Sequence, residues 1–165
     1  MKNFKTVDTV MGWVAFAIAA FTYCSTIEPT ASFWDCPEFI TTGYKLEVGH
    51  PPGAPFFMLT ANLFTQFVSD PSLVAKMVNI MSALFSAACI MFLFWSISYL
   101  VRKPARHGGQ VTTFSQAILV EARAMTGAPV SPFSDTPWST AVEGAVSAYP
   151  TPSPPLVFWL LPKCQ

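Results

Sequence analysis

The sequence predicts an all-α membrane protein, a polytopic fragment with two or more transmembrane helices. Three observations support this prediction: two uncharged apolar runs of spanning length, a loop between them punctuated by proline and acids, and a composition that is 52% hydrophobic but only 11% charged. Because a water-soluble domain needs more surface charge, membrane lipid is the expected surrounding. Lys plus Arg equal Asp plus Glu at nine each, so no basic surface for nucleic acid is expected.

The first expected span covers residues 9–27, which contain no charged residue. It follows residues 1–8, a short expected cytoplasmic N-terminus that carries Lys2 and Lys5. The rival interpretation is a cleaved signal peptide, but the apolar run is long for one and no cleavage site is followed by soluble-looking sequence. The pattern therefore favours an uncleaved transmembrane helix.

The second expected span, residues 76–101, is uncharged after its first residue and is followed at once by a basic cluster that starts at Arg102. Its many small side chains indicate close packing with neighbouring helices. Under the positive-inside rule, this cluster and the chain start lie on the same side of the membrane. Residues 102–113 are then a basic cytoplasmic loop, and residues 28–75 form an outer loop.

Two short helices are expected in the outer loop. Apolar residues recur at helical spacing from Phe56 to Val68, which predicts an amphipathic juxtamembrane helix that lies along the membrane surface. Residues 34–46, with Pro37 near a helical first turn, predict another.

The C-terminal third, residues 114–165, is poorly specified. Eight of the fifteen prolines fall from Pro129 onward, and proline at this density prevents a continuous helix. Residues 156–161 nevertheless look like the beginning of another span. This region is expected to be either a flexible tail or a degraded membrane segment.

Asp35 and Glu38 lie three residues apart just beyond the first span, and on a helix this spacing puts both carboxylates on one face. Carboxylates beside aromatic residues near a membrane can act as a general base or hold a divalent cation. The structural alternative is a helix N-terminus whose acids complement the helix dipole. Spacing alone does not separate these alternatives.

His50 precedes Pro51 and Pro52, which fix a rigid turn and hold the imidazole at a definite place. Its titration range suits proton transfer or a phosphate contact, although a His beside two prolines is more often part of a structural turn. Asp35, Glu38 and His50 could together form a metal site. The four cysteines show no zinc-ligand spacing, and no metal is assigned.

The first span, the acid pair, the His-Pro-Pro turn and the aromatic amphipathic helix together resemble GT-C glycosyltransferases of the protein O-mannosyltransferase type. The stretch WDCPEF…YKLEVGHPPGAP is similar to a bacterial family of uncharacterised multi-spanning membrane proteins, a domain of unknown function related to a eukaryotic transmembrane O-mannosyltransferase. The resemblance covers about residues 8–103. It implies an N-terminal fragment of an enzyme of the bacterial inner membrane.

The resemblance also implies a polyprenyl-phosphate sugar as donor and a protein or glycan as acceptor. Asp35 stands where such enzymes carry the catalytic carboxylate, with Glu38 as its neighbour, and would deprotonate the acceptor hydroxyl. His50 would shape the donor pocket near its phosphate. Lys45 is a second candidate phosphate contact, against its interpretation as a solvated or snorkelling lysine. A divalent cation at the acids stays open, and the expected partners are membrane lipid, the lipid-linked donor and neighbouring transmembrane helices.

The alternative function is a non-enzymatic multi-pass membrane protein, either a transporter segment or a scaffold, in which the acids and His50 only organise the loop. A transporter more often has ionisable groups inside its spans, and both spans here are uncharged. The loop is therefore the expected functional element. With only two convincing spans, the fragment is expected to be inactive alone.

Overall fold

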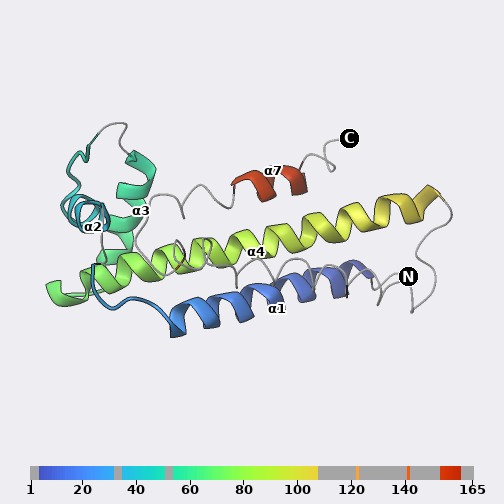
Figure 1. Ribbon diagram of the computed structural model, residues 1–165, viewed down its shortest axis with the longest axis horizontal. Coiled ribbons are helices and arrows are strands. Elements are labelled where there is room, and N and C mark those ends of the chain that lie inside the picture. Colours follow the sequence, from blue (N-terminus) through green and yellow to red (C-terminus); the bar gives the residue numbers. More distant parts are fainter. Residues whose placement is uncertain are drawn as a thin grey trace.

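The computed structural model describes residues 4–31, 35–50, 54–107, 122, 141 and 153–160 (Figure 1). Its elements are α1 (Phe4–Ser25), α2 (Cys36–Lys45), α3 (Pro55–Thr65), the 3-10 turn η1 (Pro71–Leu73), α4 (Val74–His107) and α7 (Ser153–Leu160). The long helices α1 and α4 lie side by side, and the shorter helices pack against α4. No strand occurs in these residues, so the all-α prediction is confirmed for them.

Within the described part of the chain, two segments are long and apolar enough to cross a membrane, Lys5–Ser25 and Pro71–Val101. At 1.5 Å per residue, the shorter of them extends about 30 Å, the thickness of a hydrocarbon core. The first helix ends two residues before the predicted end of the span at residue 27. The second continues through residues 102–107, which were expected in a loop. The Arg, Lys and Ala there are strong helix formers, whereas Pro104 cannot donate a backbone hydrogen bond to the helix.

Polar contacts at both ends fix the antiparallel register of α1 and α4. The Ser98 hydroxyl donates a hydrogen bond to the Asp8 carboxylate near the start of α1. At the other end, Asn79 Nδ2 donates to the carbonyl oxygens of Glu28 at 2.8 Å and Thr30 at 3.1 Å, just past the end of α1. Asn79 and Ser98 are roughly 28 Å apart along α4 at 1.5 Å per residue, close to one hydrocarbon thickness.

Small residues bring the two helices together between these contacts. The buried alanines that they share are Ala15, Ala19, Ala83 and Ala87. Gly12 faces the indole of Trp95, and a Cβ atom at Gly12 would lie 2.1 Å from Trp95 Nε1. That indole nitrogen donates to the Asp8 carbonyl at 3.1 Å. Close approach through small residues is typical of helix packing inside bilayers.

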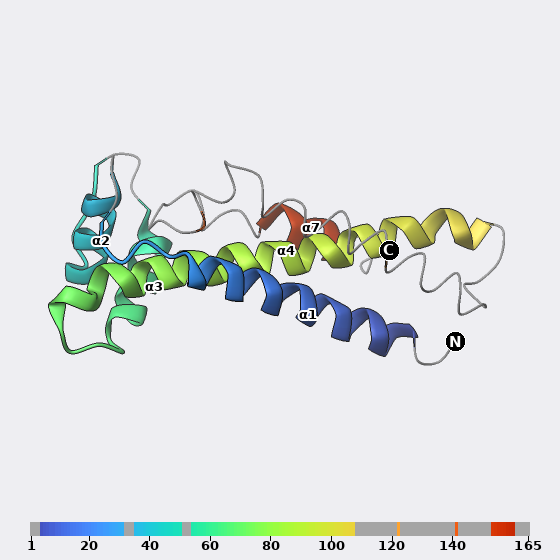
Figure 2. The same ribbon diagram turned by 60° about the horizontal axis from the view of Figure 1, so that its bottom comes forward.

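Helices α2 and α3 form a separate layer on the first turns of α4, beyond the end of α1 (Figures 1 and 2). The buried residues of this layer are Cys36, Ile40, Phe57, Met58, Ala61, Val74, Val78 and Met81. Helix α3 lies crosswise to α4 and leaves Phe56, Leu59 and Leu63 exposed on its other face. It corresponds to the helix that the sequence predicts from Phe56 to Val68, although it ends at Thr65.

The interpretation of residues 114–165 falls mostly outside the described residues. Helix α7 is the exception, and it packs against α4 with Trp159 stacked on Trp95 at a ring-centroid distance of 5.2 Å. Pro154 and Pro155 lie in its first turn, where a missing backbone N–H costs nothing.

Candidate functional site

Helix α2 begins directly after Asp35, which takes the N-cap position. Pro37 lies in the first turn, where its fixed backbone angle suits the helix. The Asp35 carbonyl accepts a hydrogen bond from the Phe39 N–H at 3.0 Å, but the Asp35 carboxylate makes no capping hydrogen bond. An acid at this position usually accepts from the first turn. The Asp35 carboxylate is therefore not used as a helix cap.

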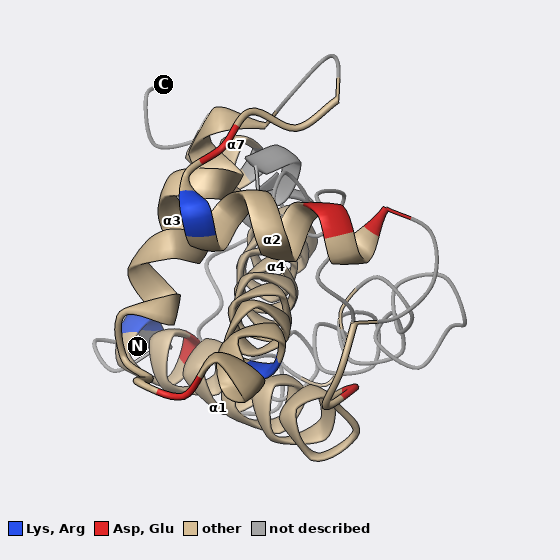
Figure 3. Cartoon of the chain, turned by 90° about the vertical axis from the view of Figure 1, so that its left-hand side faces the viewer, with Lys and Arg blue, Asp and Glu red and all other residues tan. Residues whose placement is uncertain are grey.

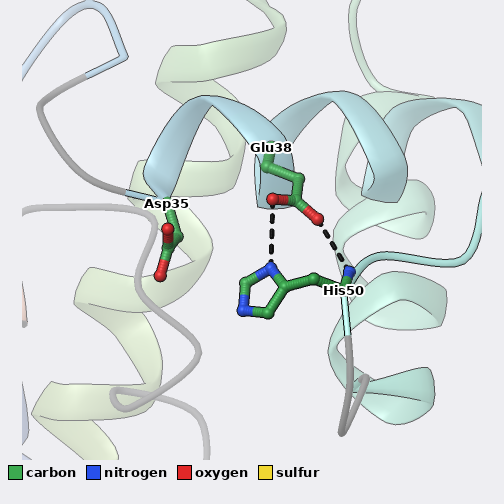
Figure 4. A group of neighbouring side chains, drawn as sticks. All are labelled: Asp35, Glu38 and His50. Carbon is green, nitrogen blue, oxygen red and sulfur yellow. Dashed lines mark hydrogen bonds and ion pairs between the residues drawn. The ribbon is translucent and has the colours of Figure 1, made fainter.

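The Glu38 carboxylate binds His50 with both of its oxygens (Figure 4). Oε1 accepts from the His50 backbone N–H at 2.8 Å, and Oε2 lies 3.0 Å from His50 Nδ1. These bonds lower the pKa of Glu38 below its ordinary value, with the backbone hydrogen bond as the largest cause. An ionised Glu38 thus ties the segment that follows α2 back to the first turn of that helix.

The contact with Glu38 sets the tautomer of His50. An ionised carboxylate only accepts, so we assign a proton to Nδ1, which leaves Nε2 as an acceptor in the neutral ring. Figure 4 shows Nε2 directed away from Glu38. Phe39 flanks the imidazole at a centroid distance of 5.6 Å. One candidate ligand atom from each of Asp35, Glu38 and His50 lies within 4.8 Å of the others, so the structure brings these three predicted residues together.

Two backbone features turn the chain from α2 towards His50. Leu46 has a left-handed φ of 55°, which is uncommon for a residue other than glycine, and ends α2 while the Glu47 N–H donates to the Thr42 carbonyl at 2.9 Å. A Cβ atom at Gly49 would lie 3.3 Å from Glu38 Oε1, so glycine allows the close approach. Residues 51–53, the remainder of the predicted His-Pro-Pro turn, lie outside the described residues.

Lys45 is not brought to this cluster. It lies in the last turn of α2, whereas Glu38 lies in the first. Seven residues of helix separate them by about 10 Å along the axis. Figure 3 shows the acidic and basic segments at opposite ends of α2.

An apolar pocket of about 490 Å³ lies between the segment after α2 and the start of α3. Its lining residues are Leu46, Glu47, Val48, Gly49, Ala54, Pro55, Met58 and Leu59. Gly49 also approaches Glu38, so the pocket lies next to the group formed by Asp35, Glu38 and His50. Sequence reasoning missed this pocket because it depends on the left-handed turn at Leu46.

Asn79 is a second feature that sequence reasoning missed. It is fully buried and holds the backbone of Glu28 and Thr30, in the segment that leads from α1 to Asp35. A lone Asn near the start of an apolar run was the available signal, because such a side chain needs a partner in lipid.

Comparison with known proteins identifies the family. Residues 35–165, most of the chain, match the model of the "Protein O-mannosyl-transferase TMEM260 N-terminal domain". The chain is also 33% identical over 96 residues to the mouse "Protein O-mannosyl-transferase TMEM260". That alignment covers 58% of this chain but 13% of the mouse protein, so the chain matches only a small part of that relative. No solved structure matches the chain. The resemblance to the eukaryotic O-mannosyltransferase is thus confirmed, and the chain belongs to the family of the TMEM260 N-terminal domain.

Proposed function

We propose that this chain supplies the catalytic carboxylate of a membrane glycosyltransferase. The whole protein would transfer a sugar from a polyprenyl-phosphate donor to a hydroxyl of a protein or glycan. Membership of an O-mannosyltransferase family supports the class of reaction. The observation that carries the proposal is the Asp35 carboxylate, which is unused as a cap and stands beside a His50 whose orientation Glu38 fixes.

Asp35 is assigned as the general base. It takes the proton of the acceptor hydroxyl, whose oxygen forms a bond to the anomeric carbon as the bond from that carbon to the donor phosphate breaks. The polyprenyl phosphate leaves with the bonding electrons, and the configuration inverts. Glu38 is a positioning residue, because both of its oxygens are occupied by His50. His50 is assigned to the donor phosphate, and Lys45 to a headgroup at the far end of α2.

The proposed setting is the outer side of a bacterial inner membrane, within a multi-pass protein. Two candidate spans with α2 and α3 do not enclose a lipid-linked sugar, so we expect transfer only from a protein that has further transmembrane helices. The apolar lining of the pocket beside the Glu38–His50 pair suits an isoprenoid chain.

The scaffold alternative is favoured by one observation, the Glu38–His50 contact, which organises the loop without any chemistry. It assigns no role to the neighbouring Asp35 carboxylate. A transferase assay therefore separates the two functions at Asp35.

The test is Asp35→Asn in the full-length protein, assayed in membranes with labelled polyprenyl-phosphate mannose. We expect transfer to be abolished while membrane insertion and protein level stay normal. Asp70→Asn is the matched control, because Asp70 is an exposed acid of the same loop and Asn keeps its capping bond to the Ser72 N–H. Retained transfer in Asp35→Asn would remove Asp35 from the mechanism and leave the scaffold function.

A further inference from the structure

We propose that Asp35 and His50 form a binding site for a divalent first-row cation such as Mn²⁺ or Zn²⁺, with Glu38 as the outer residue that orients the imidazole. The inference concerns the residues of the proposed transferase site. It is tested by binding alone, without donor or acceptor.

The first argument is the orientation of His50. A metal-binding His usually donates its other ring N–H to a carboxylate, which fixes the tautomer and raises the basicity of the ligating nitrogen. Glu38 occupies that position, with Oε2 3.0 Å from Nδ1, and its second oxygen holds the His50 backbone. This contact leaves Nε2, on the side of the ring away from Glu38, available to bind a cation (Figure 4).

The second argument is distance. The candidate ligand atoms of Asp35, Glu38 and His50 lie within 4.8 Å of one another. Two ligands at about 2.1 Å from one cation are at most about 4.2 Å apart, so the Asp35 side chain has to rotate towards Nε2 to complete the site. Asp35 is exposed, which leaves its side chain free to turn towards the imidazole that Glu38 holds.

The third argument is the chemistry of the donor set. One imidazole and one carboxylate suit Mn²⁺, Zn²⁺ or Fe²⁺ better than Ca²⁺ or Mg²⁺, which prefer oxygen ligands. Cys36, the adjacent thiol, is buried in the α2–α3 layer and adds no ligand. With two protein ligands, several coordination positions remain for water or phosphate oxygens. The cation would then meet a donor phosphate and stabilise charge on the leaving group, while the second oxygen of Asp35 still accepts a proton.

The experiment uses the full chain in zwitterionic nanodiscs, titrated with Mn²⁺ and followed by electron paramagnetic resonance. We expect one saturable site, with nitrogen couplings in the pulsed spectrum from a directly bound imidazole. Asp35→Asn should abolish saturable binding, and His50→Gln should also remove the nitrogen couplings. Glu38→Gln should weaken affinity about 10–100-fold, as outer residues of metal sites do.

Asp70→Asn is the control and should bind as the unchanged chain does. Zn²⁺ should displace Mn²⁺ at far lower concentration than Mg²⁺. Absence of saturable binding, binding without nitrogen couplings, or binding that survives Asp35→Asn would each overturn the cation site. A lack of sugar transfer would count against the proposed function and not against this site.

Discussion

At the scale of single residues, two carboxylates three positions apart have different environments. Glu38 is engaged by a neighbour twelve residues away, and its lowered pKa keeps it ionised. Asp35 occupies a cap position without capping. Sequence spacing treats the two acids as equivalent, whereas the contacts separate a positioning residue from a candidate base.

The role of Glu38 leads to a direct prediction. Glu38→Gln keeps the size of the side chain but replaces one acceptor oxygen with an NH₂ group, which cannot serve both donors of His50. We expect amide exchange at His50 to become several-fold faster, measured by hydrogen–deuterium exchange with mass spectrometry. Glu47→Gln, a charge loss at an exposed position of the same segment, should leave that exchange unchanged. Equal effects of the two variants would show that charge alone, and not the contact, orders His50.

At the scale of elements, the α1–α4 pair depends on Gly12. Replacement by valine places a branched side chain where a Cβ atom alone would lie 2.1 Å from the Trp95 indole. We expect a loss of about 1–3 kcal/mol in stability, the usual range for overpacking. Thermal unfolding in detergent measures it. Ala17→Val, on the exposed face of the same helix, is the matched control. Equal losses of stability in the two variants would mean that α1 is rotated about its axis and that Gly12 does not face Trp95.

Asn79 and Ser82 make a second pair of contrasting positions, one turn apart on α4. Both are buried, and among the described residues neither Asn79 Oδ1 nor the Ser82 hydroxyl has a hydrogen-bond partner, but Asn79 Nδ2 donates to two carbonyl oxygens. We expect Asn79→Ala to cost on the order of 1 kcal/mol and Ser82→Ala to be neutral or stabilising.

The two variants should also differ in the connection from α1 to α2. Hydrogen–deuterium exchange of the segment around Glu28 and Thr30 should rise in Asn79→Ala and stay constant in Ser82→Ala. Unchanged exchange in Asn79→Ala would mean that this segment is held by other contacts.

The elements were largely predictable from the sequence, whereas their contacts were not. Apolar run length gave both long helices and the periodicity from Phe56 gave α3, because both signals are local. The second span ends at Val101 as predicted, but the helix itself continues past it, since loss of apolar character does not end a helix. The site residues Asp35, Glu38 and His50 were named from chemistry, but their grouping depends on a left-handed Leu46 that no local pattern indicates. The distance of Lys45 from Glu38 follows from their positions at opposite ends of α2.

At the scale of the whole molecule, the polar contacts suggest where the bilayer lies. Asp8 with Ser98 at one end and Asn79 with Glu28 at the other bound a stretch of α4 about as long as a hydrocarbon core is thick. The charge-free pairing of α1 and α4 lies between them. The α2–α3 layer packs on the turns of α4 from Val74 to Met81, around Asn79 and at the level where headgroups would begin.

This placement predicts which residues touch lipid. A photoactivatable acyl-chain phospholipid, followed by mass spectrometry, should label the exposed apolar face of α1 at Trp13 and Phe21 and the exposed face of α3 at Phe56 and Leu63. Residues buried on the opposite faces of those helices should stay unlabelled, among them Ala15 of α1 and Phe57 of α3. The contrast arises because the exposed and the buried residues lie on the same helix but their side chains point to opposite sides of it.

Lipid labelling of the exposed face of α3 distinguishes two arrangements of the molecule. Labelling there means that α3 lies in the headgroup region and holds Asp35 and His50 at the surface of the bilayer, where a lipid-linked sugar presents its phosphate. Labelling of α1 without α3 would instead mean that a protein surface covers Phe56 and Leu63, because their exposed apolar area is too large to leave in water. The site would then open towards that protein and not towards lipid, and the proposed donor would have to reach it by another route.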